Sequence, residues 1–210
     1  MLNLSIKKEG PTWAIPRAYI FIGRSGCGKG TQADLLSEFL CDKYKSCRTL
    51  HIETGAFLRE FIKGDSYTQT LSREIVENGG LMPEAVMVAL WEDYLFTNYT
   101  GGENLIFDGC PRKLPEAQLL DSAFDFYKVQ LPIVFHINVG RDWAVEKLTN
   151  RSRKDDNAEA IERRLKWFDV EVEPTINFYK NNPDYIFIEI NGEQRIEEVQ
   201  KEILQKAGLD

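Results

Sequence analysis

The stretch from Gly23 to Gln32 combines residue types that bind phosphate. It reads Gly-Arg-Ser-Gly-Cys-Gly-Lys-Gly-Thr-Gln and follows the apolar run Ala18–Ile22. Its glycines let backbone N–H groups approach an anion, a helix start adds its dipole, and Lys29 supplies a mobile cation for the outer phosphates. An ordinary tight turn is the alternative, but the preceding strand and following helix favour a phosphate-binding loop. The usual motif has Ser or Thr directly after the Lys, whereas here Gly30 precedes Thr31.

A second group of candidate residues follows the apolar run Leu105–Phe107. Asp108 ends that run, and a carboxylate at a strand's carboxyl end beside a phosphate loop can hold Mg²⁺ through water. Gly109 and Pro111 shape a turn that presents Arg112, whose planar guanidinium suits bidentate phosphate binding. We therefore predict a water-mediated magnesium site at Asp108 and a phosphate site at Arg112.

Two further segments offer candidates with plain structural alternatives. After the apolar run Thr49–Ile52, Thr54 is expected to cap a helix that carries Arg59 on its second turn. A solvated surface arginine is the alternative for Arg59. From Phe61 to Pro83 the weak apolar periodicity indicates a small mobile lobe. Its two glycines before Leu81 allow the backbone to approach a flat ligand closely, and the alternative is an ordinary loop.

More arginines gather after the fourth apolar run. The segment 150–157 contains Arg151 and Arg153, and its alternative interpretation is a charged loop whose Asp156 or Asn157 caps the next helix. In that helix Ile161, Leu165, Phe168 and Val172 form an apolar stripe. At about 100° per residue, Arg164 lies roughly 60° from the centre of the stripe while Arg163 points away. Arg164 can therefore reach a cleft, and Arg163 is expected to stay in water.

The elements that must position these residues are five apolar runs separated by helical patterns. The runs are Ala18–Ile22, Thr49–Ile52, Leu105–Phe107, Ile133–Ile137 and Tyr185–Ile190. Strands that alternate with helices predict an α/β fold, a five-stranded parallel sheet with helices on both faces. Functional residues of such a sheet gather at the carboxyl ends of its strands, where the candidates above fall.

Length and composition limit the class of protein. A chain of 210 residues can bury one substantial core, which favours one domain over residues 17–210 with a short surface arm at 1–16. A net charge of −7 argues against broad nucleic-acid or membrane binding, although a local basic pocket is possible. The four cysteines form no CxxC pair, and the arm has no apolar core typical of a leader or anchor. We expect a reduced, cytoplasmic, monomeric protein without zinc.

Taken together, the motifs resemble those of the adenylate kinase family of nucleoside monophosphate kinases. They occur in the family's order from Gly23 onward: Gly-x-x-Gly-x-Gly-Lys-Gly-Thr-Gln, Thr54-Gly-x-x-Leu-Arg59, Gly80-Leu-Met-Pro83, Asp108-Gly-Cys-Pro-Arg112 and Arg153-x-Asp-Asp-Asn157. The resemblance covers nearly the whole chain after residue 17. It implies a P-loop kinase fold with a nucleotide-binding lobe at about 53–83 and a minimal lid at about 150–157.

The resemblance also implies roles for individual residues. ATP phosphates are bound by Gly26, Cys27, Gly28, Lys29, Gly30 and Thr31, and Gln194 falls where the family's backbone touches adenine. The acceptor nucleotide is bound by Thr54, Arg59, Gly80, Leu81, Met82, Gly109, Cys110, Pro111 and Arg112. Arg151, Arg153 and Arg164 close over the transferring phosphoryl group, with Lys29 and Arg112 as further catalytic residues. The cofactors implied are ATP and Mg²⁺, and the partners are small-molecule nucleotides.

This chain departs from the family pattern at several positions. Arg24-Ser25 replaces a small residue and Pro, and Cys110 replaces an aromatic residue. Only Ser152 separates Arg151 from Arg153, so the lid is a stub and water exclusion is reduced.

The acceptor base is the remaining question from the sequence. The family's adenine-reading Gln is Glu116 in this chain, and Gln118 follows on a different helix face. Transfer from ATP to AMP is the predicted reaction. One alternative is a kinase of the same fold for GMP, CMP or UMP, and of these Glu116 taken alone favours GMP. The other is a catalytically weak nucleotide-binding module, which the short lid favours.

Overall fold

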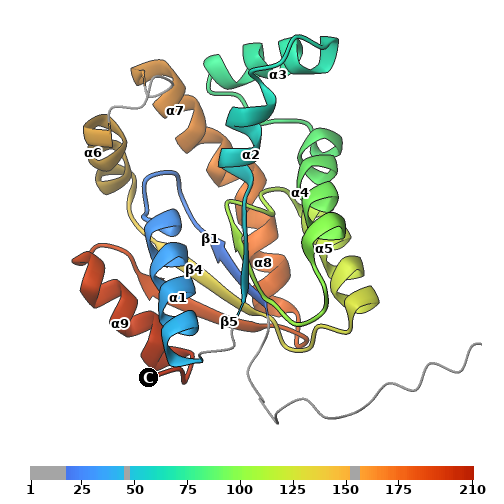
Figure 1. Cartoon of the computed structure of the whole chain (residues 1–210). Coiled ribbons are helices and arrows are strands. Elements are labelled where there is room, and N and C mark those ends of the chain that lie inside the picture. Colours follow the sequence, from blue (N-terminus) through green and yellow to red (C-terminus); the bar gives the residue numbers. More distant parts are fainter. Residues whose placement is uncertain (1–17, 45–47, 152–156) are drawn as a thin grey trace, which may run out of the picture.

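The central element of the computed structural model, which describes residues 18–44, 48–151 and 157–210, is a five-stranded sheet (Figure 1). Its strands are β1 (Ala18–Ile22), β2 (Thr49–Glu53), β3 (Asn104–Asp108), β4 (Ile133–Asn138) and β5 (Ile186–Asn191). They lie in the order β2-β3-β1-β4-β5, and every pair is parallel. The predicted α/β fold is confirmed, and each predicted run matches its strand to within one residue at either end.

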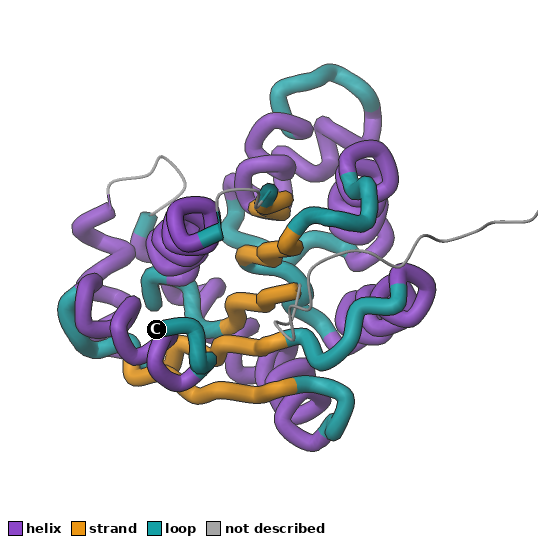
Figure 2. The backbone as a smooth tube through the Cα atoms, turned by 60° about the horizontal axis from the view of Figure 1, so that its bottom comes forward, coloured by secondary structure: helices purple, strands orange, loops and turns teal. Residues whose placement is uncertain are grey.

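Helices cover both faces of the sheet, as Figure 2 shows along the strands. They are α1 (Lys29–Lys43), α2 (Thr54–Phe61), α3 (Tyr67–Glu77), α4 (Glu84–Asn98), α5 (Leu114–Tyr127), α6 (Arg141–Arg151), α7 (Ala158–Trp167), α8 (Glu173–Asn181) and α9 (Ile196–Lys206). A π-helical turn, Phe168–Val172, joins α7 to α8. Buried side chains of α1, α6, α7 and α9 pack on one face, and those of α4, α5 and α8 pack on the other.

Strand β1 lies in the middle of the sheet because all five of its residues are apolar and buried. Side chains alternate along a strand, so Ala18, Ile20 and Ile22 face one core while Tyr19 and Phe21 face the other. A run that is apolar on both faces is stable only between two layers. The phosphate-binding loop therefore starts from the most buried strand.

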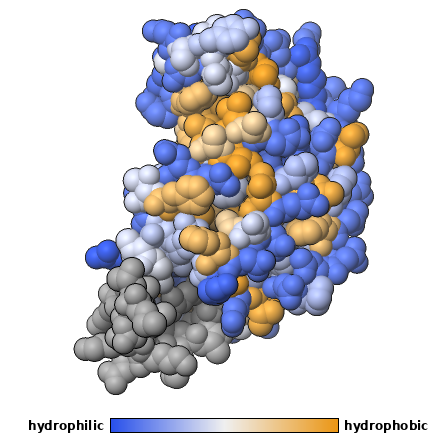
Figure 3. All heavy atoms as spheres, turned by 90° about the vertical axis from the view of Figure 1, so that its right-hand side faces the viewer, coloured by the Kyte–Doolittle hydropathy of each residue, from blue (hydrophilic) through white to orange (hydrophobic). Residues whose placement is uncertain are grey.

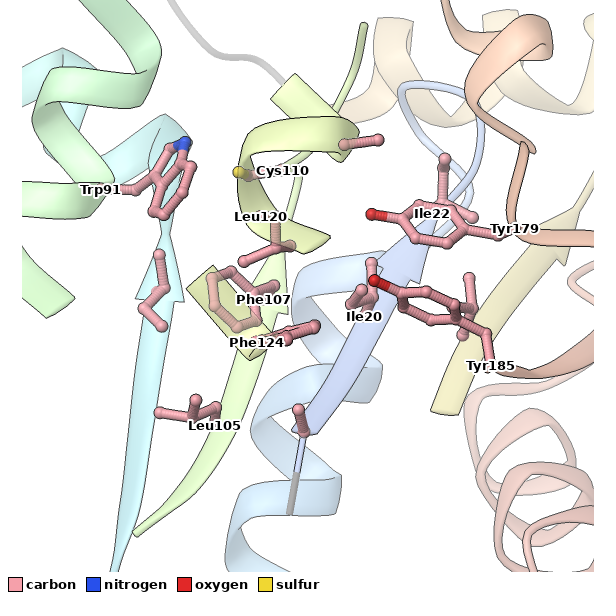
Figure 4. Packing of buried hydrophobic residues seen from close by; sticks show 14 of the residues in the cluster. Ile20, Ile22, Trp91, Leu105, Phe107, Cys110, Leu120, Phe124, Tyr179 and Tyr185 are labelled. Atoms are coloured by element: carbon pink, nitrogen blue, oxygen red, sulfur yellow. The ribbon is translucent and has the colours of Figure 1, made fainter. Parts of the chain in front are cut away.

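The core between the sheet and α4, α5 and α8 is rich in aromatic rings (Figure 4). Phe107 of β3 packs edge-on against Phe124 of α5, with ring centroids 5.6 Å apart. Tyr185 donates a 2.6 Å hydrogen bond to Asp121, so this buried hydroxyl is satisfied. Cys110 is 1% exposed and belongs to the same core, which anchors the start of the turn toward Arg112.

A small lobe, which we define as α2, α3 and the loop to Pro83, stands beside the sheet (Figure 1). Leu58 and Met82 of the lobe form an apolar cluster with Met87 of α4, and Ile75 and Val76 pack against it. The cluster is separate from both sheet cores.

The outer surface carries some apolar side chains. Figure 3 views the side on which α4 and α5 lie, and apolar atoms gather there. These two helices expose Phe96, Leu119 and Phe126. Within the described ranges, no helix combines the length and the apolar character needed to cross a membrane.

Candidate active site

A polar cavity of about 510 Å³ opens at the carboxyl ends of the strands. The sequence-predicted residues on its walls are Gly26, Gly28, Lys29, Gly30, Thr31, Arg59, Gly80, Asp108, Gly109, Arg112, Arg151 and Arg164. These residues come from segments far apart in the chain. The expectation that candidates gather at this edge of the sheet is therefore correct for this set.

The phosphate-binding loop leads directly into α1. Gly28 occupies the N-cap position with φ +94°, a conformation that favours glycine, and no side chain caps the helix. The first-turn N–H groups of α1 thus remain available to an anion in the cavity. Lys29 Nζ donates to the carbonyl oxygens of Gly23 and Arg24, both at 2.9 Å. An arriving phosphate can replace these neutral acceptors with a charge-assisted bond.

Arg24 ties the phosphate-binding loop to the π-helical turn. Its Nη1 lies 2.6 Å from Asp169 Oδ1, and its guanidinium lies over the Phe168 ring with Cζ 4.5 Å from the ring centroid. The ion pair joins residues 145 positions apart in sequence, and the ring contact joins the same two segments. The side chain that departs from the family pattern therefore anchors the loop.

Asp108, the last residue of β3, lines the cavity beside the phosphate-binding loop. The residue is 9% exposed, and its Oδ2 lies 3.1 Å from the position that a Cβ on Gly30 would occupy. A larger residue at Gly30 would meet this carboxylate. Burial raises the pKa of Asp108 above the usual aspartate value, and the Lys29 ammonium opposes the rise. A hard oxygen donor on the cavity wall fits Mg²⁺ held through water.

Among the described residues, four arginines line the same cavity as Asp108. Arg59 pairs with Glu53, 2.7 Å from Nη2 to Oε1, and is partly exposed on the second turn of α2, as predicted. Arg112 Nε donates to the Gly109 carbonyl at 2.8 Å, which fixes its fork. Arg151 lies at the end of α6, and Arg164 is buried on α7. Such convergent cations stabilise charge on a transferring phosphoryl group.

The helix α7 confirms the predicted orientation of its arginines. Arg164 is 9% exposed and lines the cavity, whereas Arg163 is exposed. Asn157 caps the helix by accepting a 2.8 Å hydrogen bond from the Ala160 N–H, one of the two predicted caps. Arg153 and Asp156 lie outside the described residues.

Several predicted site residues lie elsewhere than on the walls of the large cavity. Cys27, Met82 and Cys110 are buried in the apolar clusters, and Pro111 lines a smaller cavity beside Arg112. Leu81 is half-buried and is absent from the walls. Gln194 donates to the Asn191 carbonyl at 2.8 Å and to Glu202 at 2.6 Å.

The predicted helix cap at Thr54 is wrong. Strand β2 continues to Glu53, which takes the N-cap position, so Thr54 is already the first residue of α2. Its hydroxyl instead donates to the Gly109 carbonyl at 3.0 Å. Thr54 is fully buried and joins the start of the small lobe to the turn that carries Arg112.

Glu116 occupies the first turn of α5 and is 1% exposed. Its Oε2 accepts a 3.0 Å hydrogen bond from the Arg112 N–H, and its Oε1 is buried without a hydrogen-bond partner among the described residues. Burial raises the pKa of this carboxyl, while Arg112 and Lys113 oppose the rise. Gln118 is exposed. Glu116 therefore supports the Arg112 turn and lies off the cavity walls.

The cavity walls also contain residues that were not among the predicted site residues. Those with charged, imidazole or indole side chains are Asp34, His51, Glu53, Lys147 and Trp167, and the others are Ser25, Gly55, Leu58 and Val76. Helical spacing could have found two of them, because Lys147 precedes Arg151 by four residues and Trp167 follows Arg164 by three. His51 Nδ1 lies 3.3 Å from Asp34 Oδ1, a contact between β2 and α1 that no local pattern indicates.

Comparison with known proteins agrees with this geometry. The family model described as adenylate kinase matches residues 21–184. An adenylate kinase of Prochlorococcus marinus (strain MIT 9515) is 33% identical over 187 residues, 89% of this chain and 96% of that protein. Adenylate kinase 1 of Nostoc sp. is 32% identical over 189 residues, 90% of this chain and 97% of that protein. The chain therefore belongs to the adenylate kinase family of phosphotransferases.

Proposed function

We propose that this enzyme catalyses ATP + AMP ⇌ 2 ADP, with Mg²⁺. The observation that carries the proposal is one cavity whose walls bring together Lys29 and Asp108 with Arg59, Arg112 and Arg164. Its volume of about 510 Å³ and its charged walls suit phosphate groups. The relatives named above are called adenylate kinases, which supports AMP as the acceptor.

In an in-line phosphoryl transfer, the residues on the walls have separate roles. An AMP phosphate oxygen attacks the γ-phosphorus of ATP, the bond to the β,γ-bridging oxygen breaks, and ADP leaves with that electron pair. The N-terminus of α1 and Lys29 hold the ATP phosphates, while Arg59 and Arg112 hold the acceptor phosphate. Arg151 and Arg164 neutralise charge between the two nucleotides.

Asp108 would hold Mg²⁺ through water. When bound, that ion neutralises phosphate charge and orients the phosphate oxygens. The roles of Arg153, Leu81, Met82 and Gln194 rest on the family resemblance.

A coupled assay tests the proposal directly. Purified protein with ATP and Mg²⁺ is supplied with AMP, CMP, UMP or GMP, and ADP formation is followed. We expect AMP to give the highest kcat/KM. Turnover at the no-enzyme background with every acceptor would leave only a nucleotide-binding module, the alternative that the short lid favours.

A second acceptor deserves a test because of Glu116. Adenine presents a donor at N6 and an acceptor at N1, whereas an ionised carboxylate can only accept, and guanine presents two donors. Backbone groups of Gly80–Met82 can compensate, and for this reason we place AMP first. If Glu116 contacts the base, Glu116→Gln raises kcat/KM for AMP relative to GMP by up to the roughly 5–150-fold that corresponds to about 1–3 kcal/mol for an unpaired buried polar group.

The pH dependence sharpens this test. The protonated Glu116 carboxyl still has an O–H that can donate to N1 of adenine. Burial raises the pKa of Glu116, so the protonated form persists to higher pH. The gain in Glu116→Gln should therefore grow with pH. A ratio unchanged at every pH would show that another group reads the base, and Gln118→Leu is the matched control on an exposed face of the same helix.

A further inference from the structure

Trp167, the last residue of α7, joins two parts of the cavity that sequence reasoning treats separately. Its Nε1 donates to the Gly79 carbonyl in the small lobe at 3.3 Å. The Arg112 guanidinium lies over its ring, with Cζ 5.7 Å from the ring centroid, which is within range of a cation–π contact. One side chain thus contacts the lobe and a phosphate-binding arginine.

The small lobe rests on the same face of α7 at two further points. Arg163 Nη1 donates to the Asn78 carbonyl at 2.8 Å. A Cβ added to Gly79 would lie 2.6 Å from Ala160 Cα, so the two backbones approach closely. Ala160, Arg163 and Trp167 follow the i, i+3, i+7 spacing of one helix face. The loop at Gly79 therefore contacts α7 at several points between Ala160 and Trp167.

The Arg112 guanidinium is held from two directions. The Gly109 carbonyl accepts from its Nε at 2.8 Å, and the Trp167 ring covers one of its faces. The backbone is held too, because Thr175 donates to the Arg112 carbonyl at 3.0 Å. With the plane of the guanidinium restricted in this way, less conformational entropy is lost when it binds a phosphate.

We propose that Trp167 is a positioning residue for the acceptor nucleotide: its ring orients Arg112, and its N–H holds the small lobe against α7. This inference rests on the proposed function, since it assigns Arg112 and the small lobe to the acceptor. Through these contacts α7 restrains the acceptor side of the cavity directly. The donor side, at the phosphate-binding loop, makes no hydrogen bond to Trp167 among the described residues.

Two substitutions separate the ring from the N–H. Trp167→Phe keeps a ring over Arg112 and loses the donor, whereas Trp167→Leu loses both. We expect KM for AMP to rise about 3–10-fold in Trp167→Phe and further in Trp167→Leu, with KM for ATP within about twofold of the parent. Trp143→Phe is the control, because Trp143 is equally half-buried but lies on α6 outside the cavity walls.

A binding readout keeps the test independent of turnover. AMP is titrated while tryptophan fluorescence is followed, and the change on binding should be lost in Trp167→Phe and retained in Trp143→Phe. An unchanged KM for AMP in both Trp167 variants, or an equal rise in KM for ATP, would overturn the inference. If the parent shows no turnover with any acceptor, the proposed function fails, and the fluorescence titration still decides the role of Trp167.

Discussion

Replacing Gly79 with Ala tests how closely the small lobe is seated on α7. Gly79 follows the last turn of α3 with φ +66°, and its N–H donates to the Val76 carbonyl at 2.9 Å. The added methyl would lie 2.6 Å from Ala160 Cα, which is closer than Cβ contacts in real proteins. Because this atom belongs to the backbone of α7, it cannot move aside as a flexible side chain could. Strain must therefore appear in the lobe, in α7, or in the distance between them.

Gly208 supplies a matched control for the backbone term. It follows α9 with φ +65°, close to the φ of Gly79. The N–H of the next residue, Leu209, donates to the Leu204 carbonyl, just as the N–H of Gly80 donates to the Ile75 carbonyl. A Cβ on Gly208, however, would meet no atom within 4 Å. Both substitutions force alanine into the left-handed region at a cost of about 1 kcal/mol. Only Gly79→Ala adds a steric cost, about 1–3 kcal/mol for an overpacked contact.

Thermal unfolding and acceptor kinetics together measure that difference. At about 2–4 °C per kcal/mol for a chain of this size, we expect Gly208→Ala to lower Tm by about 2–4 °C and Gly79→Ala by at least about twice as much. If the lobe instead moves away, the steric cost is relieved and KM for AMP rises. Equal Tm values together with equal KM values in the two variants would refute the close contact.

Three further predictions concern Lys29, the lid and Glu116. Lys29→Met should lower kcat by orders of magnitude with little change in the unfolding midpoint, because the ammonium follows the migrating charge; near-parental turnover in the coupled assay would contradict this. With a lid stub, ADP release from ATP without acceptor should exceed the no-enzyme background, and a rate at background would reject a leaky site. Glu116→Gln should become more stable relative to the parent as pH rises. The folded-state pKa of Glu116 is raised, so the parent loses stability as pH rises through that pKa, whereas Gln does not titrate. Urea unfolding of both proteins at pH 5 and pH 8 measures this, and an equal difference in unfolding free energy at the two pH values contradicts it.

The sequence alone was sufficient for the parts of the site that depend on local backbone geometry. A strand, a glycine-rich loop and a helix start follow one another between Ala18 and Lys43, and the proposed phosphate site uses the N–H groups of that one segment. Asp108 and Arg112 were found in the same way, since each follows directly from the end of a strand. Parallel strands bring these ends to one edge whatever the loops do.

Only the tertiary structure decided which side chains meet across segments. Thr54 could cap its own helix or bond to a neighbouring turn, and the choice depended on where β2 ended beside β3. Glu116 could reach a base or hold the Arg112 turn, and the packing of α5 on the core settled its hydrogen bond to Arg112. Trp167 meets Gly79 across 88 residues of sequence. Such contacts depend on the relative placement of helices, which apolar periodicity along one segment does not encode.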